Sequence, residues 1–285
     1  MVSIIITAYN VAEYIKETIE SCISQTFDNI EIIVVEDCST DSTKQIIKEM
    51  MKKDDRIRLI QNKQNVGAGQ SRRNGLDAAK GEYFLLLDGD DWIESDFIED
   101  LYDKAIKTNA DIVSGGIKVV RENGAYDITS YGNTVTEGHD KVIKFWKERI
   151  VFMNNKLIRT KLHNAVPYCT RRFVEDTPTI VPMLYLANKV VYVDNVGYNY
   201  RMQESSLTHK ATRLKWAIFR ALCAFDLIDF FKLHDVELMK KLSLNSNLAS
   251  QIKIIKQENP TIEDLKQLED GWMELSLKLV MTSLN

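Results

Sequence analysis

The chain has 285 residues, enough for one large domain or for one domain with an appendage. Hydrophobic residues make up 45% of it and charged residues 27%, a composition typical of soluble globular proteins. The formal net charge of −4 argues against a nucleic-acid binder that works through bulk positive charge. No run approaches the roughly 18 apolar residues of a membrane-spanning helix. The cysteines form no C-x-x-C pair, so we expect a cytoplasmic protein with reduced thiols.

The N-terminal third of the chain alternates between strand and helix patterns. Short β-branched runs predict buried strands at Val2–Thr7, Ile30–Val35, Ile57–Ile60 and Tyr83–Leu87. Apolar residues at helical spacing predict helices between them, over about 12–23, 42–53 and 69–80. Asp41 or Ser42 would cap the second helix. This alternation predicts an α/β fold with a mainly parallel sheet covered by helices on both faces.

Polar residues follow each of these strands at its C-terminal end. The four clusters are Thr7-Ala8-Tyr9-Asn10, Glu36-Asp37, Gln61-Asn62 and Asp88-Gly89-Asp90-Asp91. Ligands of open α/β sheets bind outside the carboxyl ends of the strands. We therefore expect three of the four clusters to face one cleft.

The rest of the chain changes in texture. Its patterns predict a strand, two helices and two further strands, at Ala110–Val120, Gly138–Arg149, Thr177-Pro178 to about Asn188, Val190–Val193 and Tyr198–Met202. From about Ala211 apolar residues recur at helical spacing, with one proline and one glycine among them. The sequence thus predicts an α/β domain over residues 1–210 and a helical C-terminal extension over residues 211–285.

The run Leu87-Asp88-Gly89-Asp90-Asp91 places three carboxylates on one tight turn after an apolar strand. Carboxylates this close repel one another, and a divalent cation with a preference for oxygen ligands, Mg²⁺ or Mn²⁺, removes that cost. Such an ion would bridge phosphate oxygens and neutralise a diphosphate leaving group. Gly89 would let the backbone approach the ligand closely. The alternative is a solvated acidic turn before a helix over Asp96–Lys107.

A series of motifs follows in order along residues 2–208. They are V-S-I-I-I-T-A-Y-N from Val2, V-V-E-D-C-S-T-D from Val34, N-V-G from Asn65, R-N-G from Arg73, G-E-Y from Gly81, L-D-G-D-D from Leu87, N-K-L from Asn155, Glu175-Asp176, and Tyr200-Arg201 through Ser206-Leu207-Thr208. The series resembles glycosyltransferase family 2, inverting nucleotide-sugar transferases with the GT-A fold. Glu36, Cys38 and Arg72 stand where the family usually has Asp, Gly and Ala. The resemblance implies a GT-A catalytic domain, Rossmann-like with a mixed, mainly parallel sheet, over residues 1–210.

The resemblance also implies how the nucleotide is bound. Thr7 and Tyr9 would contact the base, and Asp37 would accept a hydrogen bond from the uracil N–H, which suits a buried carboxylate. Arg73 would approach the base or the diphosphate, and Asp88 would hold the ribose or a metal-bound water. The alternatives are a packed aromatic ring for Tyr9, a cap for Asp37 and a surface position for Arg73.

Further residues are candidates for the metal, the diphosphate and the acceptor. Asp90 would ligate Mn²⁺ or Mg²⁺ directly, with Asp88 and His209 as further candidate ligands. By the same resemblance Lys156 and Arg201 would meet the diphosphate or the acceptor. Trp92 would line the sugar or acceptor site. A structural role is the alternative for His209, Lys156, Arg201 and Trp92.

The resemblance also implies that Asp176 is the catalytic base. An inverting transfer is one in-line displacement at the anomeric carbon, so the acceptor hydroxyl must lose its proton as it attacks. A carboxylate base contributes about 10²–10⁴-fold to such a step. Asp176 precedes the helix start predicted at Thr177-Pro178, where the helix dipole favours the ionised carboxylate by about 0.3–1 kcal/mol. The alternative is that Asp176 caps this helix.

The resemblance implies transfer of a hexose-type sugar from a UDP-sugar to a hydroxyl of a carbohydrate or glycoconjugate, such as a surface polysaccharide. An inactive nucleotide-sugar-binding module with the same fold and a sugar-phosphate nucleotidyltransferase are alternatives. The sequence has no G-x-G-x-x-G after the first strand and no G-x-x-x-x-G-K-[ST], which argues against nicotinamide-dependent and P-loop enzymes. No nucleic-acid partner is expected. The mixed charges of residues 211–285 favour packing or self-association over peripheral membrane contact.

Overall fold

The structure, a computed structural model, describes residues 1–148, 152–171, 173–203, 211–258, 260–261, 274–276 and 278. The chain divides into two compact units. The first consists of Met1–Arg172 and Met183–Gln203, and the second of Phe173–Pro182 and Glu204–Asn285. Each unit is described by itself below.

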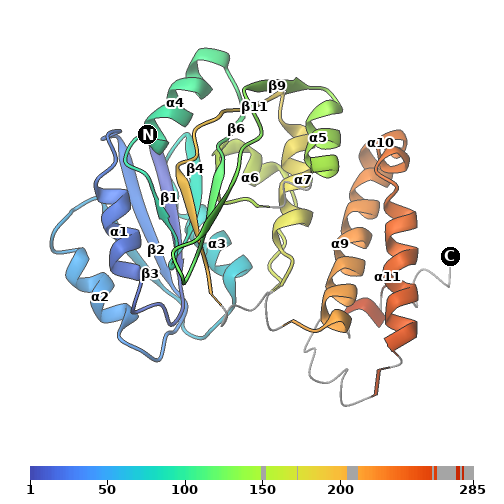
Figure 1. The fold of residues 1–285 in the computed structure, drawn as a ribbon, viewed down its shortest axis with the longest axis horizontal. Coiled ribbons are helices and arrows are strands. Elements are labelled where there is room, and N and C mark those ends of the chain that lie inside the picture. The colour runs from blue at the N-terminus through green and yellow to red at the C-terminus, as the bar shows by residue number, and fades with distance from the viewer. Residues whose placement is uncertain are drawn as a thin grey trace. The chain divides into compact units, whose positions relative to one another are not determined.

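A mixed sheet forms the centre of the first unit (Figure 1). Its order is β3-β2-β1-β4-β10-β6-β11-β9. The strands span Val2–Ala8 (β1), Ile30–Glu36 (β2), Ile57–Gln61 (β3), Tyr83–Asp88 (β4), Ile112–Ser114 (β6), Thr134–Glu137 (β9), Lys156–Arg159 (β10) and Lys189–Tyr192 (β11). β3, β2, β1 and β4 are parallel to their neighbours, whereas β10 is antiparallel to both β4 and β6. The four strands predicted in the N-terminal third are confirmed, each longer by one residue.

A second sheet of the first unit has the order β5-β12-β7-β8. Its strands span Trp92–Ile93 (β5), Ile117–Arg121 (β7), Tyr126–Thr129 (β8) and Tyr198–Met202 (β12). The single strand predicted over Ala110–Val120 is therefore wrong, because β6 and β7 belong to different sheets. Gly115 and Gly116 lie between them, and a Cβ atom on Gly115 would collide with the ring of Phe97. The chain changes sheet at the point where a side chain does not fit.

Helices cover both faces of the central sheet. Those that begin in the first unit span Ile15–Ile23 (α1), Thr43–Met50 (α2), Ala68–Asp77 (α3), Phe97–Thr108 (α4), Asp140–Glu148 (α5) and Lys161–Ala165 (α6). Ile4 and Ile6 of β1 share a hydrophobic core with apolar residues of α1, α2 and α4. Ile5 points to the opposite face, where a Cβ atom on Gly75 of α3 would collide with it. Successive side chains of β1 thus point to opposite faces of the sheet and pack against a layer of helices on each face.

The helix α7 spans Asp176–Leu186, with its first residues in the second unit and its last in the first. It begins at Asp176, one residue before the predicted N-cap at Thr177, so Asp176 lies inside the first turn. The second unit also contains α9 (Arg213–His234), α10 (Val236–Lys241) and α11 (Leu244–Glu258). Side chains cap two of these helices: Thr212 Oγ1 accepts from the Lys215 N–H, and Asp235 Oδ1 from the Leu238 N–H. The predicted helical character after Ala211 is confirmed for the described residues.

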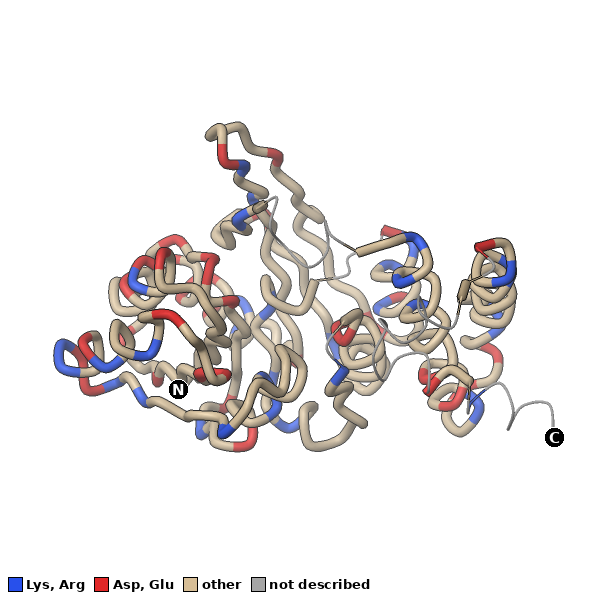
Figure 2. The backbone as a smooth tube through the Cα atoms, turned by 90° about the horizontal axis from the view of Figure 1, so that it is seen from below, with Lys and Arg blue, Asp and Glu red and all other residues tan. Residues whose placement is uncertain are grey.

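Charges of both signs are interspersed along the backbone of each unit (Figure 2), in keeping with the small net charge. Among the residues that the structure describes, no helix combines the length and the apolarity needed to cross a membrane.

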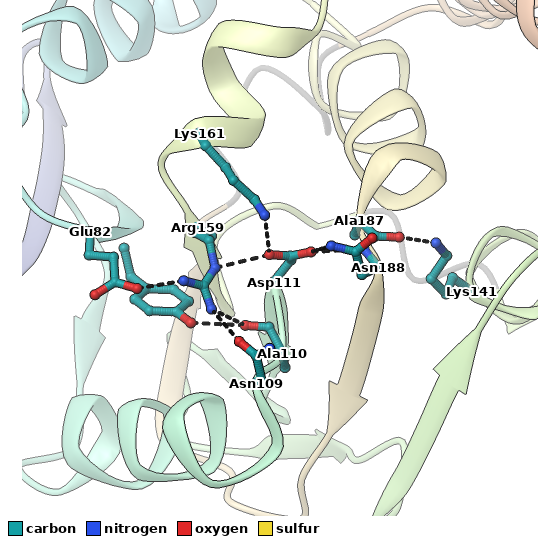
Figure 3. A network of polar contacts seen from close by, with 10 residues as sticks. Glu82, Asn109, Ala110, Asp111, Lys141, Arg159, Lys161, Ala187 and Asn188 are labelled. Atoms are coloured by element: carbon teal, nitrogen blue, oxygen red, sulfur yellow. Dashed lines mark hydrogen bonds and ion pairs between the residues drawn. The ribbon is translucent and has the colours of Figure 1, made fainter.

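A buried ionic network joins separate elements of the first unit (Figure 3). Asp111, just before β6, has a side chain that is 3% exposed and pairs with Arg159 and Lys161, each at 2.9 Å. The backbone N–H and the side-chain amide of Asn188 donate to its other oxygen, at 2.8 and 3.0 Å. This carboxylate therefore connects β6, β10, α6 and the loop between α7 and β11.

Candidate active site

The acidic turn follows β4 at the carboxyl edge of the parallel strands. The Gly89 N–H donates to the Thr7 carbonyl of β1 at 2.9 Å, and the Thr18 hydroxyl of α1 donates to the Gly89 carbonyl at 2.9 Å. A Cβ atom on Gly89 would lie 2.7 Å from the Thr7 carbonyl oxygen. The sequence predicted that the backbone at Gly89 approaches a ligand closely. In the structure this backbone packs against β1, and that contact fixes where the turn begins.

Asp88 is held by three side chains from different elements. Arg72 of α3 and Thr7 of β1 donate to its Oδ1 at 2.9 and 3.2 Å, and Asn154 donates to its Oδ2 at 2.7 Å. Burial works to raise the pKa of Asp88, but the Arg72 charge and the three donors outweigh it and hold the pKa below its usual value. Asp88 is therefore ionised, and both of its oxygens have protein partners.

The electrostatic surroundings of Asp90 shift its pKa in the opposite direction to that of Asp88. Burial, followed by the negative charge of Asp88, raises its pKa to about 6. Its Oδ2 accepts from Gln203 Nε2 at 3.1 Å, and its carbonyl accepts from Arg201 Nε at 2.8 Å. A positive charge beside Asp90 would stabilise the ionised carboxylate.

Asp91 is 1% exposed and faces β12. The Tyr198 hydroxyl donates to its Oδ2 at 2.6 Å, and the Arg201 N–H donates to its Oδ1 at 2.8 Å. Burial and the neighbouring charges of Asp90 and Asp88 raise the pKa of Asp91 well above its usual value. Asp91 thus connects the turn to β12.

Arg201 and Trp92, both predicted as site residues, lie together at this turn. The Arg201 guanidinium lies 4.5 Å from the centre of the Trp92 ring and 4.8 Å from that of Tyr14. It also donates to Glu17 Oε2 of α1 at 2.7 Å. Arg201 therefore contacts residues of the turn and of α1 at the same time.

The end of β2 lies beside the loop that leads into α3. Asp37 is 3% exposed and accepts from the Asn62 amide, the Val66 N–H and the Gly67 N–H at 2.8–2.9 Å. These bonds match the alternative of a cap, and contact with a base stays a prediction. Tyr9 is 46% exposed just beyond β1.

The loops after β1 and β2 are joined to each other. Asn10 Oδ1 accepts from the Thr40 N–H, and Asp41 accepts from the Ala12 N–H and from the Thr43 N–H, which opens α2. Asp41 thus caps α2 from the position before Ser42, which is the N-cap residue and makes no capping bond with its own side chain. Cys38, at the position of the family's glycine, has a φ of 61°, the left-handed conformation that favours glycine.

The structure distinguishes between the two neighbouring arginines of α3. The side chain of Arg72 is 6% exposed and pairs with Asp88, whereas that of Arg73 is 47% exposed and lies 3.8 Å from Asp77 of its own helix. Arg73 is thus a surface residue of α3, and its approach to the nucleotide stays a prediction. The signal for Arg72 was its helical spacing, since Gly69, Arg72 and Leu76 share the buried side of α3.

Three other predicted residues lie in different surroundings. Lys156 is fully buried, and its ammonium donates to the Phe152 carbonyl at 2.5 Å and to Asn155 Oδ1 at 2.6 Å, contacts that favour the structural alternative. Asp176 lies in the first turn of α7, within the second unit. His209 lies outside the described residues.

Asn154, which contacts Asp88, was missed by the sequence reasoning. It is 4% exposed and lies just before β10, in an irregular segment where neither periodicity nor a turn pattern marks it. Only its proximity in sequence to the N-K-L motif pointed there.

The donor set at the turn is compatible with a magnesium-type ion. No group of three or more His, Cys, Asp or Glu side chains suited to a metal occurs among the described residues. Mg²⁺ is commonly bound by one or two carboxylates together with waters and substrate phosphates. Asp90 fits as the direct ligand, whereas the contacts of Asp88 with Arg72, Thr7 and Asn154 suit an indirect role.

Comparison with known proteins places this geometry in a family. The family described as Glycosyl transferase family 2 matches residues 3–174. Glycosyltransferase GlyG of Streptococcus pneumoniae serotype 4 is 31% identical over 228 residues, which are 76% of either chain. Glycosyltransferase GlyA of the same organism is 32% identical over 226 residues, 75% of this chain but only 32% of that protein.

A solved structure confirms the fold. The crystal structure of S. aureus TarS 1–349 in complex with UDP-GlcNAc superposes with a TM-score of 0.70 at 22% identity, and the match covers 96% of this chain and 79% of that TarS 1–349 chain. The mixed α/β fold predicted from the strand pattern is therefore that of GT-A glycosyltransferases. From the family match and the relatives, the chain belongs to glycosyltransferase family 2 and is a glycosyltransferase.

Proposed function

We propose that this glycosyltransferase moves a hexose-type sugar from a UDP-sugar to an acceptor hydroxyl, with inversion and with the help of Mn²⁺ or Mg²⁺. The observation that carries the proposal is the half-buried Asp90 carboxyl, which shares the turn with the ionised Asp88 and has its pKa raised to about 6. Such a carboxyl gains a divalent cation readily, because the cation offsets both burial and repulsion. The complexes of TarS with UDP-GlcNAc and with UDP support UDP as the nucleotide.

The residues of the turn divide the work between them. Asp90 would ligate the ion, and Arg72 and Asn154 hold Asp88 in one orientation, from which it would reach the ribose or a metal-bound water. When bound, the ion would neutralise charge on the diphosphate leaving group. Arg201, held by Glu17 and the Asp90 carbonyl, adds a positive charge on the same side of the turn.

Asp176 is proposed as the base that removes the proton from the acceptor hydroxyl. Its place in the first turn of α7 supports this role, because the positive end of a helix dipole favours the ionised carboxylate. We further propose a catalytic domain over residues 1–210 and a helical extension over 211–285. That extension would serve self-association, or contact a membrane surface from the cytoplasm, and the acceptor would be a carbohydrate or glycoconjugate.

Isothermal titration of UDP with and without Mn²⁺ tests the metal site. We expect Mn²⁺ to tighten UDP binding in the wild-type protein, and Asp90→Asn to remove that enhancement because one ligand charge is lost. Asp55→Asn, which changes an exposed carboxyl, is the matched control and should leave the enhancement intact. UDP binding that does not respond to Mn²⁺ in the wild type would sink the metal-assisted mechanism.

Asp176→Asn tests the base. Hydrolysis of a panel of UDP-sugars by the wild type first identifies the donor. The rate at which this sugar is transferred to a carbohydrate acceptor is then compared between the wild type and Asp176→Asn. Transfer should fall by about 10²–10⁴-fold while UDP affinity stays the same. A comparable loss of both would make Asp176 a structural residue. A wild type that binds UDP with Mn²⁺ but turns over no UDP-sugar would be the inactive binding module.

A further inference from the structure

The third carboxylate of the turn, Asp91, is oriented toward β12. Both oxygens of Asp91 accept hydrogen bonds from β12, one from the Tyr198 hydroxyl at 2.6 Å and one from the Arg201 N–H at 2.8 Å. Asp91 and Tyr198 are each 1% exposed. Because a charged or polar group this buried needs its partners, the pair fixes the end of the turn against the strand.

The same hydroxyl connects this pair to Asp88. Tyr198 has one hydroxyl proton, which it donates to Asp91, so its oxygen is left to accept from Asn154 Nδ2 at 3.1 Å. The Asn154 amide also donates to Asp88 Oδ2 at 2.7 Å. The hydrogen bonds thus form a chain from Asp88 through Asn154 and Tyr198 to Asp91, and the backbone of the turn closes it into a ring.

Asp90 belongs to the turn that closes this ring, and it lies in sequence between Asp88 and Asp91, the two carboxylates that the ring holds. Its own backbone is fixed by the Arg201 Nε bond to its carbonyl, and the preceding Gly89 carbonyl by the Thr18 hydroxyl. The Asp90 side chain therefore projects from a segment whose neighbours on both sides are anchored to β12 and to Asn154. Ligand residues anchored in this way lose little freedom when a metal binds.

We infer that Tyr198 is a positioning residue for the metal ligand Asp90, acting through Asp91 on one side and through Asn154 and Asp88 on the other. The inference rests on the proposed metal-assisted function. Tyr198 touches neither the ion nor the nucleotide in this scheme. Its hydroxyl holds the two flanking carboxylates so that Asp90 is presented to the ion in one orientation.

Tyr198→Phe removes the hydroxyl alone, and the chain offers a matched control in Tyr192→Phe. Tyr192 is also fully buried, on β11, and its hydroxyl has no hydrogen-bond partner among the described residues. UDP affinity is measured by calorimetry at increasing Mn²⁺ concentrations, and thermal unfolding is followed in parallel. For Tyr198→Phe we expect the Mn²⁺ concentration at half-maximal enhancement to rise by about 10-fold or more, the effect typical of residues that orient metal ligands. UDP affinity without metal, and both quantities in Tyr192→Phe, should stay unchanged.

A second variant guards against a general loss of folding. Asp91→Asn keeps an oxygen for the Arg201 N–H but loses the acceptor of the Tyr198 proton, so its Mn²⁺ dependence should shift in the same direction. A wild-type Mn²⁺ dependence in Tyr198→Phe would overturn the inference while leaving the proposed function standing. Equal losses of UDP affinity with and without metal in both variants would also overturn it, because the network would then be merely structural. Absence of any Mn²⁺ effect in the wild type would instead overturn the proposed function, and the inference with it.

Discussion

Adjacent residues of α3 with identical chemistry have opposite environments, and helix geometry is the reason. Arg72 points into the first unit and pairs with Asp88, whereas Arg73 points outward toward Asp77. One residue along a helix turns the side chain by about 100°, so the arginine that the motif marks faces solvent while its neighbour reaches Asp88.

Arg72→Ala and Arg73→Ala should therefore differ in stability. Removal of Arg72 leaves Asp88 without its cation, and we expect the free energy of unfolding to fall by about 2 kcal/mol. This is below the ~3–5 kcal/mol of fully buried pairs, since 27% of the Asp88 side chain is exposed. Arg73→Ala removes an exposed pair and should cost less than about 0.5 kcal/mol. Urea unfolding measures the free energy of unfolding of both variants. Equal losses would mean that the Arg72 pair stabilises the protein no more than the exposed Arg73 pair does.

At the scale of the elements, polar contacts join strands that are far apart in the sequence. β6, β10 and the loop before β11 meet around Asp111, whose partners come from well-separated segments of the chain (Figure 3). Burial works to raise the pKa of Asp111, but the Asn188 N–H, Lys161 and Arg159 outweigh it and hold the pKa below its usual value.

Asp111→Asn should destabilise the protein in a pH-dependent way. At pH 7 we expect a loss of about 2–4 kcal/mol in the free energy of unfolding, because Arg159 loses a buried partner. Because the pKa of Asp111 is lower in the folded than in the unfolded protein, the ionised carboxylate stabilises the folded state at pH values above the unfolded-state pKa of about 3.9. This stabilisation is lost as the pH falls through the folded-state pKa. The gap between variant and wild type should thus narrow below about pH 4. Urea unfolding at pH 7 and pH 3.5 checks this, with the exposed Asp103→Asn as control; a gap independent of pH would contradict it.

At the scale of the whole molecule, the proposed base belongs to the helical unit. Phe173 is 5% exposed, and its ring centre lies 4.6 Å from that of Trp216 and 5.4 Å from that of Phe219, both on α9. The segment that begins α7, and with it Asp176, is therefore supported by the C-terminal helices. The extension would then influence catalysis without any residue of its own in the chemistry.

Trp216→Ala tests this influence. Loss of the indole should loosen Phe173, three residues before Asp176, and so lower the rate of sugar transfer by about 10-fold or more, as misplacement of a catalytic group does. Mn²⁺-dependent UDP affinity should be unchanged, because its residues lie in the first unit. Leu233→Ala, at an 84% exposed position of the same helix, serves as control. Transfer rates like those of the wild type would show that α9 does not support the base.

The sequence by itself determined the elements whose signal is local. Strand and helix patterns in the N-terminal third, the Asp41 cap and the helices after Ala211 follow from periodicity and capping chemistry, which act over a few residues. The ordered motifs also determined the family. The break between β6 and β7 was missed because the Phe97 ring, which leaves no room for a side chain at Gly115, lies outside the local sequence pattern.

Only the tertiary structure decided which polar side chains meet. It brought Arg72 and Asn154 to Asp88, turned Asp91 toward Tyr198, and buried Lys156 against Asn155 and the Phe152 carbonyl. The physical reason is that these contacts join α3, β4, β10 and β12, and no short-range pattern specifies which donor faces which carboxylate. The carboxylates of the turn could be found from the sequence, whereas the residues that orient them could be found only in the folded chain.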